Sequence, residues 1–353
     1  MRVFAEQARQ RAVEVLEAHG APAPVAAAQA DHLVEADLRD RPSHGIQRLP
    51  TLVGRIRHGL LRPAAVPELR WISGSLLEVD GGLGLGPPVA FRVLEALVGR
   101  ARGCGISLAA IARAGHLGML APYLEWCVER GVLVVALTTS EALVHPHGGR
   151  RPLIGTNPIG IGVPVLDGEP LVLDMATAAI SKGAIIAAAQ RGVSLPTGVA
   201  IDASGMPTSD PVAATDGAIS PFGGAKGYGL GLAIQLIVGT ITGTAFGEEV
   251  TGTLDTTYPV TKGDLFLVLD PEFGGGVEAL RRGSAFLAQL RGSEPAAGSE
   301  RVWVPGDRSR RTRAVRAASG YEVPGELWSQ LGRLRRAGAG GEPVGLSRGG
   351  DVR

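Results

Sequence analysis

Cysteine is scarce in this sequence, since its 353 residues include only Cys104 and Cys127. Two thiols provide neither a disulfide framework nor a cysteine-based metal cluster, and their scarcity favours a reducing compartment, the cytoplasm. Neither sign of charge is in excess, because 35 lysines and arginines face 34 aspartates and glutamates and leave a net charge of +1. We therefore expect no electrostatic binding to nucleic acid or to membrane surfaces.

Several widespread catalytic motifs are also missing. The glycine-rich segment 81–86 has the wrong spacing for Gly-x-Gly-x-x-Gly, and neither Lys182 nor Lys226 lies in a phosphate-binding P-loop. His-Glu-x-x-His and Gly-x-Ser-x-Gly do not occur, which excludes the zinc peptidases and α/β-hydrolases that carry them. The sequence thus lacks a standard Rossmann fingerprint, and it predicts no bound metal.

One run without charged residues, from Gly227 to Gly247, has about the length of a membrane span. It is rich in glycine and threonine, stands alone in the chain and has a basic flank, Lys226, on one side only. A helix buried on all sides in a protein core explains this run better than a membrane span. Residues 1–19 have the pattern of an amphipathic helix rather than that of a signal peptide.

Apolar residues make up 45% of the chain and charged residues 20%, which predicts a folded protein with a large core. Strand-like and helix-like segments alternate in the middle, while helices dominate both ends. We therefore expect an α/β fold in which both termini form an outer helical layer. Helices are predicted at 3–19, 22–38, 48–60, 87–102, 118–130, 226–242, 276–290, 308–318 and 324–336, and strands at 70–80, 104–112, 131–139, 171–174 and 265–270.

Residues with catalytic potential cluster in the segment 43–48 (Ser-His-Gly-Ile-Gln-Arg), at the entry to a predicted helix. Ser43 can cap this helix, and a spacing of four residues would put His44 and Arg48 on one helical face. Arginine grips a carboxylate bidentately, and histidine exchanges a proton near neutral pH, so the pair suits a 2-oxo or 2-hydroxy acid. The alternative is a capped helix with surface charges.

Two further regions have the composition of ligand-binding loops. His116 stands between glycines after a predicted strand, where the next helix begins and would offer amide donors to a phosphate. Segments 155–158 (Gly-Thr-Asn-Pro) and 173–177 (Leu-Asp-Met-Ala-Thr) supply small polar residues at strand edges. A capping loop and ordinary turn chemistry are the alternatives.

Basic residues mark the start of two other predicted helices. Gly224 and Lys226 precede the uncharged run, and Arg308, Arg310 and Arg311 crowd a helix start near the C-terminus. Both arrangements suit an anion such as a phosphate. The alternatives are a tight turn into a buried helix and a solvated helix face.

The motifs form an ordered set across the chain: SHGIQRLP, AGHLGML, GTNPIGIGVP, LDMAT, PTSDP, PFGGAKGYGLGLA, KGDLFLVLDPE and VPGDRSR. From about residue 5 to residue 335, this set resembles the second malate/L-lactate dehydrogenase family, which is unrelated to the Rossmann-type lactate dehydrogenases. Its members include ureidoglycolate, sulfolactate and 2,3-diketogulonate oxidoreductases and reductases of cyclic imines. The resemblance implies a non-Rossmann nicotinamide-binding α/β fold and a homodimer with active sites near the subunit interface.

The resemblance also implies a division of the chain and roles for its residues. Residues 1–78 with 308–338 would form a helical substrate and dimerisation region, 79–307 an α/β cofactor-binding region, and 339–353 a flexible tail. His44, oriented by Ser43, would exchange the proton, Arg48 would hold the substrate carboxylate, and His116 would line the site and share the acid–base role. Expected cofactor contacts are His116, Leu117, Gly118, Met119, Leu120, Thr156, Asp174, Met175, Ala176, Gly224, Lys226, Gly227, Gly306, Arg308 and Arg310.

Two departures from the family leave the substrate open. Ala184 stands where members often carry a charged residue that supports the histidine, and Thr51–Leu52 where they often have a tyrosine. We expect an NAD(P)-dependent oxidoreductase of a small 2-oxo or 2-hydroxy acid, with NADP favoured over NAD by the arginines near residue 310. The alternatives are a reductase of a cyclic imino acid, of the piperideine- or pyrroline-2-carboxylate type, and a non-catalytic nucleotide-binding relative.

Overall fold

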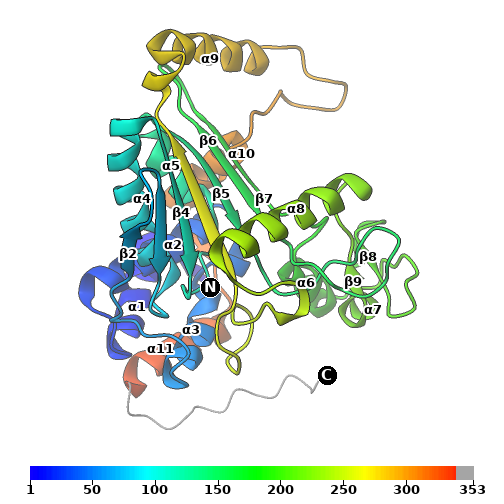
Figure 1. Ribbon diagram of the computed structural model, residues 1–353. Helices are drawn as coiled ribbons and strands as arrows, with labels where there is room; N and C mark the ends of the chain where they lie inside the picture. The colour runs from blue at the N-terminus through cyan, green and yellow to red at the C-terminus, as the bar shows by residue number, and fades with distance from the viewer. Residues whose placement is uncertain (339–353) are drawn as a thin grey trace.

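A seven-stranded mixed sheet forms the centre of the protein, whose computed structural model describes residues 1–338 (Figure 1). In sheet order, the strands are β2 (Glu68–Trp71), β3 (Leu76–Asp80), β4 (Ile106–Ala112), β10 (Gly263–Leu269), β5 (Leu133–Thr138), β6 (Ile159–Val163) and β7 (Leu171–Met175). Within this sheet β3 and β4 run parallel, and the other neighbouring pairs are antiparallel. The expected non-Rossmann α/β fold is therefore confirmed, because a Rossmann sheet is mostly parallel.

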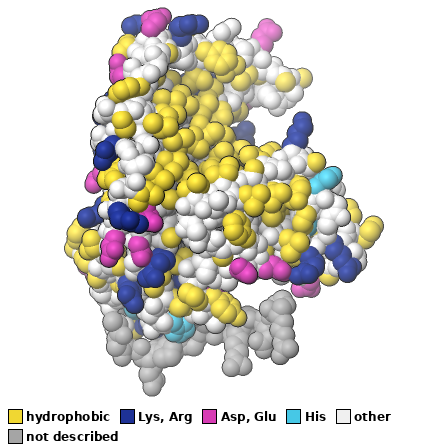
Figure 2. Space-filling model, viewed as in Figure 1, with side chains coloured by type: hydrophobic (Ala, Val, Ile, Leu, Met, Phe, Trp, Pro, Cys, Tyr) yellow, Lys and Arg dark blue, Asp and Glu magenta, His cyan; other side chains and the backbone are white. Residues whose placement is uncertain are grey.

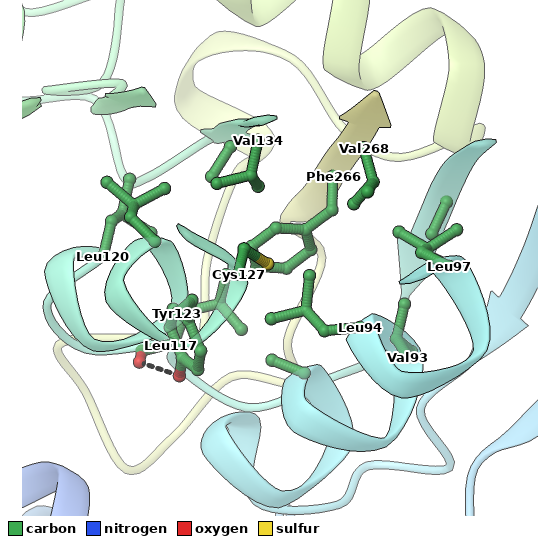
Figure 3. Packing of buried hydrophobic residues seen from close by; sticks show 14 of the residues in the cluster. Val93, Leu94, Leu97, Leu117, Leu120, Tyr123, Cys127, Val134, Phe266 and Val268 are labelled. Carbon is green, nitrogen blue, oxygen red and sulfur yellow. Dashed lines mark hydrogen bonds between the residues drawn. The ribbon is translucent and has the colours of Figure 1, made fainter. Parts of the chain in front are cut away.

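Helices cover both faces of this sheet. They are α4 (Gly86–Cys104) and α5 (Ala121–Val128) on one face and α8 (Ala225–Thr242) on the other. The rings of Tyr123 and Phe266 lie 5.7 Å apart in the core beneath α4 and α5 (Figure 3). Leu265, the preceding residue of β10, instead packs with Ile234 and Val238 of α8. Successive residues of β10 thus point to opposite faces, as the period of a strand requires.

Both ends of the chain form an outer helical layer, as the sequence predicts (Figure 1). Its helices are α1 (Ala5–Ala18), α2 (Ala23–Leu38), α3 (Leu49–Arg57), α10 (Asp307–Ser319) and α11 (Gly325–Ala337). Short strands β1 (Arg2–Val3) and β11 (Tyr321–Glu322) pair antiparallel and join the two ends. Leu16, Leu33, Leu49 and Leu331 share the buried cluster of this layer. The segment expected to be a flexible tail, 339–353, lies outside the described residues.

A smaller unit follows β7, and the sequence patterns predict none of its elements. It consists of α6 (Lys182–Arg191), β8 (Ala200–Ile201), α7 (Pro211–Asp216) and β9 (Ala218–Ile219). Val144, Ile185 and Leu195 contribute to its own buried cluster. A further helix, α9 (Gly276–Arg291), extends beyond the end of β10 at the top of Figure 1.

Strand β6 is missing from the predicted strands because its sequence, Ile-Gly-Ile-Gly-Val, contains two glycines, which are depleted in strands. Both glycines face α5. A methyl group at Gly160 would lie 3.1 Å from Leu124, and one at Gly162 would lie 2.9 Å from Val128, both residues of α5. The close approach of α5 to the sheet therefore requires glycine at these positions.

The expectation that the uncharged run forms a helix buried on all sides is wrong. One face of α8 is buried through Gly231, Ile234 and Val238, whereas Leu236 and Ile237 are 51% and 48% exposed. Figure 2 shows hydrophobic side chains gathered over the region that α8 and the neighbouring sheet occupy in Figure 1. No helix among residues 1–338 is long and apolar enough to cross a membrane. The absence of charged residues thus reflects two apolar faces of α8. One face packs on the sheet, and the sequence run does not indicate what covers the other.

The start of α4 lies directly against the loop of His116. A methyl group built on Gly86 would lie 2.3 Å from the carbonyl oxygen of His116, whereas one on Gly99, in the middle of the same helix, would meet nothing within 4 Å. We predict that Gly86→Ala lowers the free energy of unfolding by about 1–3 kcal/mol, because the backbone of the loop must move.

The matched control is Gly99→Ala, which should raise that free energy by about 0.5–1 kcal/mol because alanine is the better helix former. Urea unfolding followed by circular dichroism measures both changes. Equal effects of the two substitutions would contradict the tight contact at Gly86.

Candidate active site

The segment 43–48 was expected to place His44 and Arg48 on one helical face, but it does not form a helix of that length. It folds into two 3-10 turns, Pro42–His44 and Ile46–Arg48, joined by Gly45 in an extended conformation. Helix α3 starts only at Leu49, and its N-cap is Arg48 rather than Ser43. The two turns still bring the imidazole and the guanidinium to one site, because α3 continues directly from the second turn.

Ser43 contacts the ring of His44 instead of capping the helix. Its Oγ lies 3.1 Å from Nδ1 of His44, which fixes the orientation of the imidazole and leaves Nε2 for a ligand. On the other side, a methyl group at Gly183 would lie 2.9 Å from Cβ of Ser43. The start of α6, where Ala184 stands, therefore lies beside this serine.

The imidazoles of His44 and His116 stack on each other with ring centroids 5.6 Å apart. The amide of Gly118 donates to Nδ1 of His116 at 3.1 Å, so the proton of this neutral ring lies on Nε2. Burial, and then the charge of Arg48, lower the pKa of His44 to about 4. The same causes lower the pKa of His116. Both imidazoles are therefore neutral at neutral pH, and each offers one donor and one acceptor.

Arg48 is the cation of this site. One terminal nitrogen of its guanidinium donates to the carbonyl oxygen of Thr253. Its buried Nε has no hydrogen-bond partner in the part of the chain that the structure describes. A half-buried guanidinium with an unused donor beside two neutral imidazoles suits an incoming carboxylate.

The main chain at 253–258 closes over Arg48 and is held from two directions. Glu141, after β5, accepts from the amides of Thr253 and Leu254 at 2.5 and 2.9 Å. The fully buried Arg55 of α3 donates to the carbonyl oxygens of Asp255 and Tyr258 at 2.8 and 3.1 Å. Sequence reasoning missed these residues, because the contacts of Glu141 and of Arg55 join segments 112 and 200 positions apart. The signal available in the sequence was the spacing of seven residues between Arg48 and Arg55, which places both arginines on one side of a helix.

Two other buried polar groups lie near the histidines and were also missed. Lys262 and Asp264 form an ion pair of 2.5 Å, with both side chains about 1% exposed. The charge of Lys262 is one of the causes that lower the pKa of His116. His32 is buried and stacks on Tyr123 at 4.7 Å, and neither of its ring nitrogens has a partner among the described residues.

The start of α5 was expected to offer its amides to a phosphate. In the structure a side chain already uses the first of these amides. The carboxylate of Asp174, at the end of β7, accepts from the amide of Ala121 at 2.8 Å. Asp174 therefore occupies the first helical donor itself and joins the loop 116–120 to the segment 174–176. Thr156 lies beside the end of this segment, because its carbonyl oxygen accepts from the amide of Thr177 at 2.8 Å. Its own amide donates to Ser140 Oγ at 2.9 Å.

The start of α8 is open, unlike that of α5. Gly224, its N-cap, has a φ of +63°, and a methyl group there would meet nothing within 4 Å. The side chain of Lys226 is exposed in the first turn. By contrast, Gly227 packs against the carbonyl of Phe222, where a methyl group would come within 2.0 Å. Close packing against Phe222 therefore explains why residue 227 is a glycine.

The arginines at the start of α10 differ in their surroundings. Arg310 pairs with Asp307 and Glu169, both at 2.9 Å, and Arg311 pairs with Glu300 at 3.3 Å. Arg308 has no ion-pair partner among residues 1–338 and lies 5.5 Å from the ring of Trp303. Gly306, with a φ of +101°, is the N-cap of the helix.

A recess of about 670 Å³ lies beside these arginines. Its lining includes Glu169, Arg301, Trp303, Asp307 and Arg311. No group of histidine, cysteine, aspartate and glutamate residues in the described part of the chain has the arrangement of a metal site.

Comparisons with known proteins give consistent matches. The family model described as malate/L-lactate dehydrogenase matches residues 3–332. L-sulfolactate dehydrogenase of Methanocaldococcus jannaschii is 36% identical over 92% of this chain and 94% of its own. A Delta(1)-pyrroline-2-carboxylate/Delta(1)-piperideine-2-carboxylate reductase of Pseudomonas syringae pv. tomato is 35% identical over 86% and 88%. The crystal structure of a dehydrogenase from Sinorhizobium meliloti superposes with a TM-score of 0.91 at 44% identity, covering 95% and 98%.

The burial of His32 generates a prediction about pH. Burial lowers the pKa of His32 from 6.5 to about 3, so between these values the unfolded chain holds a proton that the folded protein lacks. Folding stability is therefore lost as the pH falls below 6.5, by up to about 1.4 kcal/mol per unit for this group. His32→Phe keeps the stack on Tyr123 and removes this loss.

Urea unfolding at pH 7.5 and pH 5.5 checks this effect. The stability lost between the two should be about 1.4 kcal/mol smaller in His32→Phe than in the wild type. His147→Gln is the control, because His147 is exposed and should leave the pH dependence unchanged. The same loss in wild type and His32→Phe would show that His32 titrates normally when folded.

Proposed function

The chain belongs to the malate/L-lactate dehydrogenase family, and from this premise we propose the reaction that its site carries out. It is an oxidoreductase, since its relatives are dehydrogenases and reductases. The proposed reaction transfers a hydride between a nicotinamide cofactor and a small 2-oxo or 2-hydroxy carboxylic acid. A reductase of a cyclic imino acid, of the piperideine- or pyrroline-2-carboxylate type, is the second candidate.

The observation that carries the proposal is the half-buried Arg48 beside the stacked pair of His44 and His116. The guanidinium binds the carboxylate of the substrate through its unused donor and through the donor that Thr253 now occupies. The reacting carbonyl or hydroxyl group, one bond away from that carboxylate, then lies at the imidazoles. This fixed geometry accounts for the choice of a 2-substituted acid.

The proton is exchanged by His44, which Ser43 holds through Nδ1. Before an acid binds, burial and then the charge of Arg48 keep the pKa of His44 near 4. A carboxylate bound to Arg48 neutralises that charge, so substrate binding raises the pKa of His44 toward the range in which general acid–base catalysis is efficient. His116, whose Nε2 carries a proton, donates a hydrogen bond to the substrate oxygen and shares this role.

Residues along β7 and the start of α8 fit a dinucleotide, which supplies the hydride when bound. The open start of α8 with Gly224 and Lys226 suits the phosphates. The recess beside Trp303 lies near the start of β7, because Val172, the second residue of this strand, donates to the carbonyl of Pro305. Asp174 lies two residues further along the strand, roughly 7 Å away by strand geometry. We propose that the remaining expected contacts in 116–120, 156, 174–176 and 306–310 complete this cofactor site.

The surroundings of Ser43 favour an oxo acid over an imino acid. The start of α6 lies against Ser43, and its first turn, where Ala184 stands, carries no acidic residue. A protonated imine is a cation and gains from a nearby carboxylate, whereas a neutral carbonyl group needs only a hydrogen-bond donor. The site therefore supports the oxo or hydroxy acid as the main substrate class.

We also propose a homodimer in the cytoplasm. The exposed apolar side chains of α8, among them Leu236, Ile237 and Ile241, suit a face that a second copy covers. Cys104 is exposed and free, which fits a reducing compartment. In this arrangement residues 1–78 with 308–338 bind the substrate and add contacts to the partner, while 79–307 supply most of the cofactor site and present α8 to the partner.

Variants of the two central residues test the proposed reaction. With a panel of 2-oxo acids and cyclic imino acids, nicotinamide absorbance should report faster reduction of the oxo acids. His44→Ala should lower kcat by about two to four orders of magnitude because the proton carrier is lost. Arg48→Lys should raise KM at least tenfold, because lysine lacks the planar fork that binds a carboxylate.

Cofactor binding is the control for both variants. Fluorescence titration should give the same Kd for the reduced cofactor in wild type, His44→Ala and Arg48→Lys. Full turnover of His44→Ala would leave His116 as the proton carrier. Weaker cofactor binding by Arg48→Lys would place Arg48 on a phosphate of the cofactor.

The arginines near Trp303 generate a prediction about cofactor choice. Asp307 is occupied by Arg291 and Arg310 and is not free to accept from a ribose hydroxyl, as an NAD site would require. Among Arg308, Arg310 and Arg311, Arg308 is the one without an ion-pair partner among residues 1–338, and we propose it for the 2′-phosphate. We expect NADPH to bind more tightly than NADH, and Arg308→Ala to weaken NADPH about tenfold while NADH changes little.

Arg281→Ala is the matched control, since Arg281 is exposed on α9 and pairs only with Glu278 at 3.4 Å. It should leave both affinities unchanged in the same fluorescence titration. Tighter binding of NADH by the wild type, or an equal loss of both cofactors in Arg308→Ala, would rule out a 2′-phosphate pocket at Arg308.

A further inference from the structure

Asp37, in the last turn of α2, lies behind the catalytic segment. Its side chain is buried, with 5% exposed, and its Oδ2 accepts from the amide of Ile46 at 3.0 Å. A methyl group built on Gly45 would lie 1.8 Å from Oδ1 of the same carboxylate. Gly45 has a φ of −87°, which any residue adopts, so this glycine is required by the carboxylate behind it. The carboxylate therefore supports the main chain between His44 and Arg48.

The charged and titratable groups around Asp37 do not neutralise it. Arg316 of α10 donates to the backbone carbonyl of Asp37 at 2.7 Å and pairs with Asp40 at 2.6 Å. Its charge lowers the pKa of Asp37 by less than burial raises it. The hydroxyl of Tyr321, from β11, is buried close by. No basic side chain of the described residues forms an ion pair with the carboxylate of Asp37. Burial consequently raises its pKa to about 7.

Such a carboxylate is costly for the fold. A buried anion without a cation destabilises the folded protein, and an asparagine or serine would satisfy the amide of Ile46 at a lower cost. Strongly perturbed carboxylates of this kind concentrate at functional sites, where they hold other groups in place. Asp37 lies beside Gly45 and Ile46, which join His44 to Arg48. The group that it holds is therefore the main chain between these two residues.

We propose that Asp37 is a positioning residue that sets the separation of His44 and Arg48 by holding the backbone of Gly45 and Ile46. The inference rests on the proposed function of His44 and Arg48. It goes further because Asp37 touches neither substrate nor cofactor. Short 3-10 turns hold their own shape poorly, so the distance between imidazole and guanidinium depends on this external support.

The ionisation of Asp37 gives this support a pH dependence. The ionised carboxylate makes a charge-assisted hydrogen bond to the amide of Ile46, about twice as strong as that of the neutral acid. As the pH falls through about 7, Asp37 takes up a proton and its hold on the segment weakens. The value of kcat/KM should therefore fall on the acid side of neutrality, before His44 or the substrate carboxylate is affected.

Three variants test this proposal through kcat/KM measured from pH 5.5 to pH 9. Asp37→Ala should lower kcat/KM about 10- to 100-fold at pH 8, because the segment loses its support. Asp37→Asn keeps an oxygen for the amide of Ile46 and should stay within about threefold of the wild type at pH 8, while the decline near pH 7 disappears. Asp31→Asn, an exposed residue of the same helix paired with Arg9, should match the wild type at every pH.

Gly45→Ala provides a second measurement, which is the coupling between Gly45 and the carboxylate of Asp37. Alone it should lower kcat/KM strongly, since its methyl group collides with the carboxylate. Combined with Asp37→Ala, it should add no more than a twofold further loss, because the obstacle is gone. Equal losses in both backgrounds would overturn the proposal.

Cofactor titration and His44→Ala separate this proposal from the proposed function. If His44→Ala abolishes turnover while Asp37→Ala and Asp37→Asn keep the wild-type pH profile, only the positioning role fails. If His44→Ala leaves turnover intact, the proposed function fails. A decline near pH 7 that persists in Asp37→Asn overturns the role of its ionisation, and unchanged kcat/KM in Asp37→Ala overturns the positioning role itself.

Discussion

The site depends on a stretch of main chain that needs support from outside. Two 3-10 turns carry His44 and Arg48, and such turns make fewer and poorer hydrogen bonds than an α-helix. Asp37 supports them from the helical layer through the amide of Ile46. From the opposite side, the carbonyl of Thr253 accepts from Arg48, and Glu141 fixes that carbonyl in turn. The catalytic geometry is thus set by helices and strands distant in sequence.

The electrostatics of the site follow from burying one cation beside two imidazoles. Desolvation and the charge of Arg48 act in the same direction, so His44 and His116 are both neutral before an anion arrives. A bound carboxylate neutralises the charge of Arg48, whereas the desolvation of the imidazoles remains. Binding of the acid and protonation of His44 are therefore coupled, and a substrate without a carboxylate would leave the imidazole a weak base. In the proposed reaction the arginine would both select the substrate and regulate the proton carrier.

The sequence predicted more of the fold than of the site. Alternating apolar segments between turn residues located the central strands, and most helices begin or end at prolines and glycines, as α4 does. Strand β6 escaped because its glycines are explained only by the approach of α5. Motif spacing identified His44, Arg48 and His116, but it could not place Glu141 over Arg48 or Asp174 at the start of α5. Those contacts are long-range, and local patterns carry no record of them.

Unsatisfied polar groups mark the same region independently of any motif. Folded proteins pair nearly all buried donors and acceptors, so an exception requires an explanation. Several exceptions among the described residues surround the site, namely Nε of Arg48, both nitrogens of His32, Oδ1 of Asp264 and the hydroxyl of Tyr321. The free energy lost there is not recovered locally, and the four apolar clusters of helices and sheet must supply it. Packing elsewhere therefore permits a polar centre, in which Nε of Arg48 remains as a donor for a ligand.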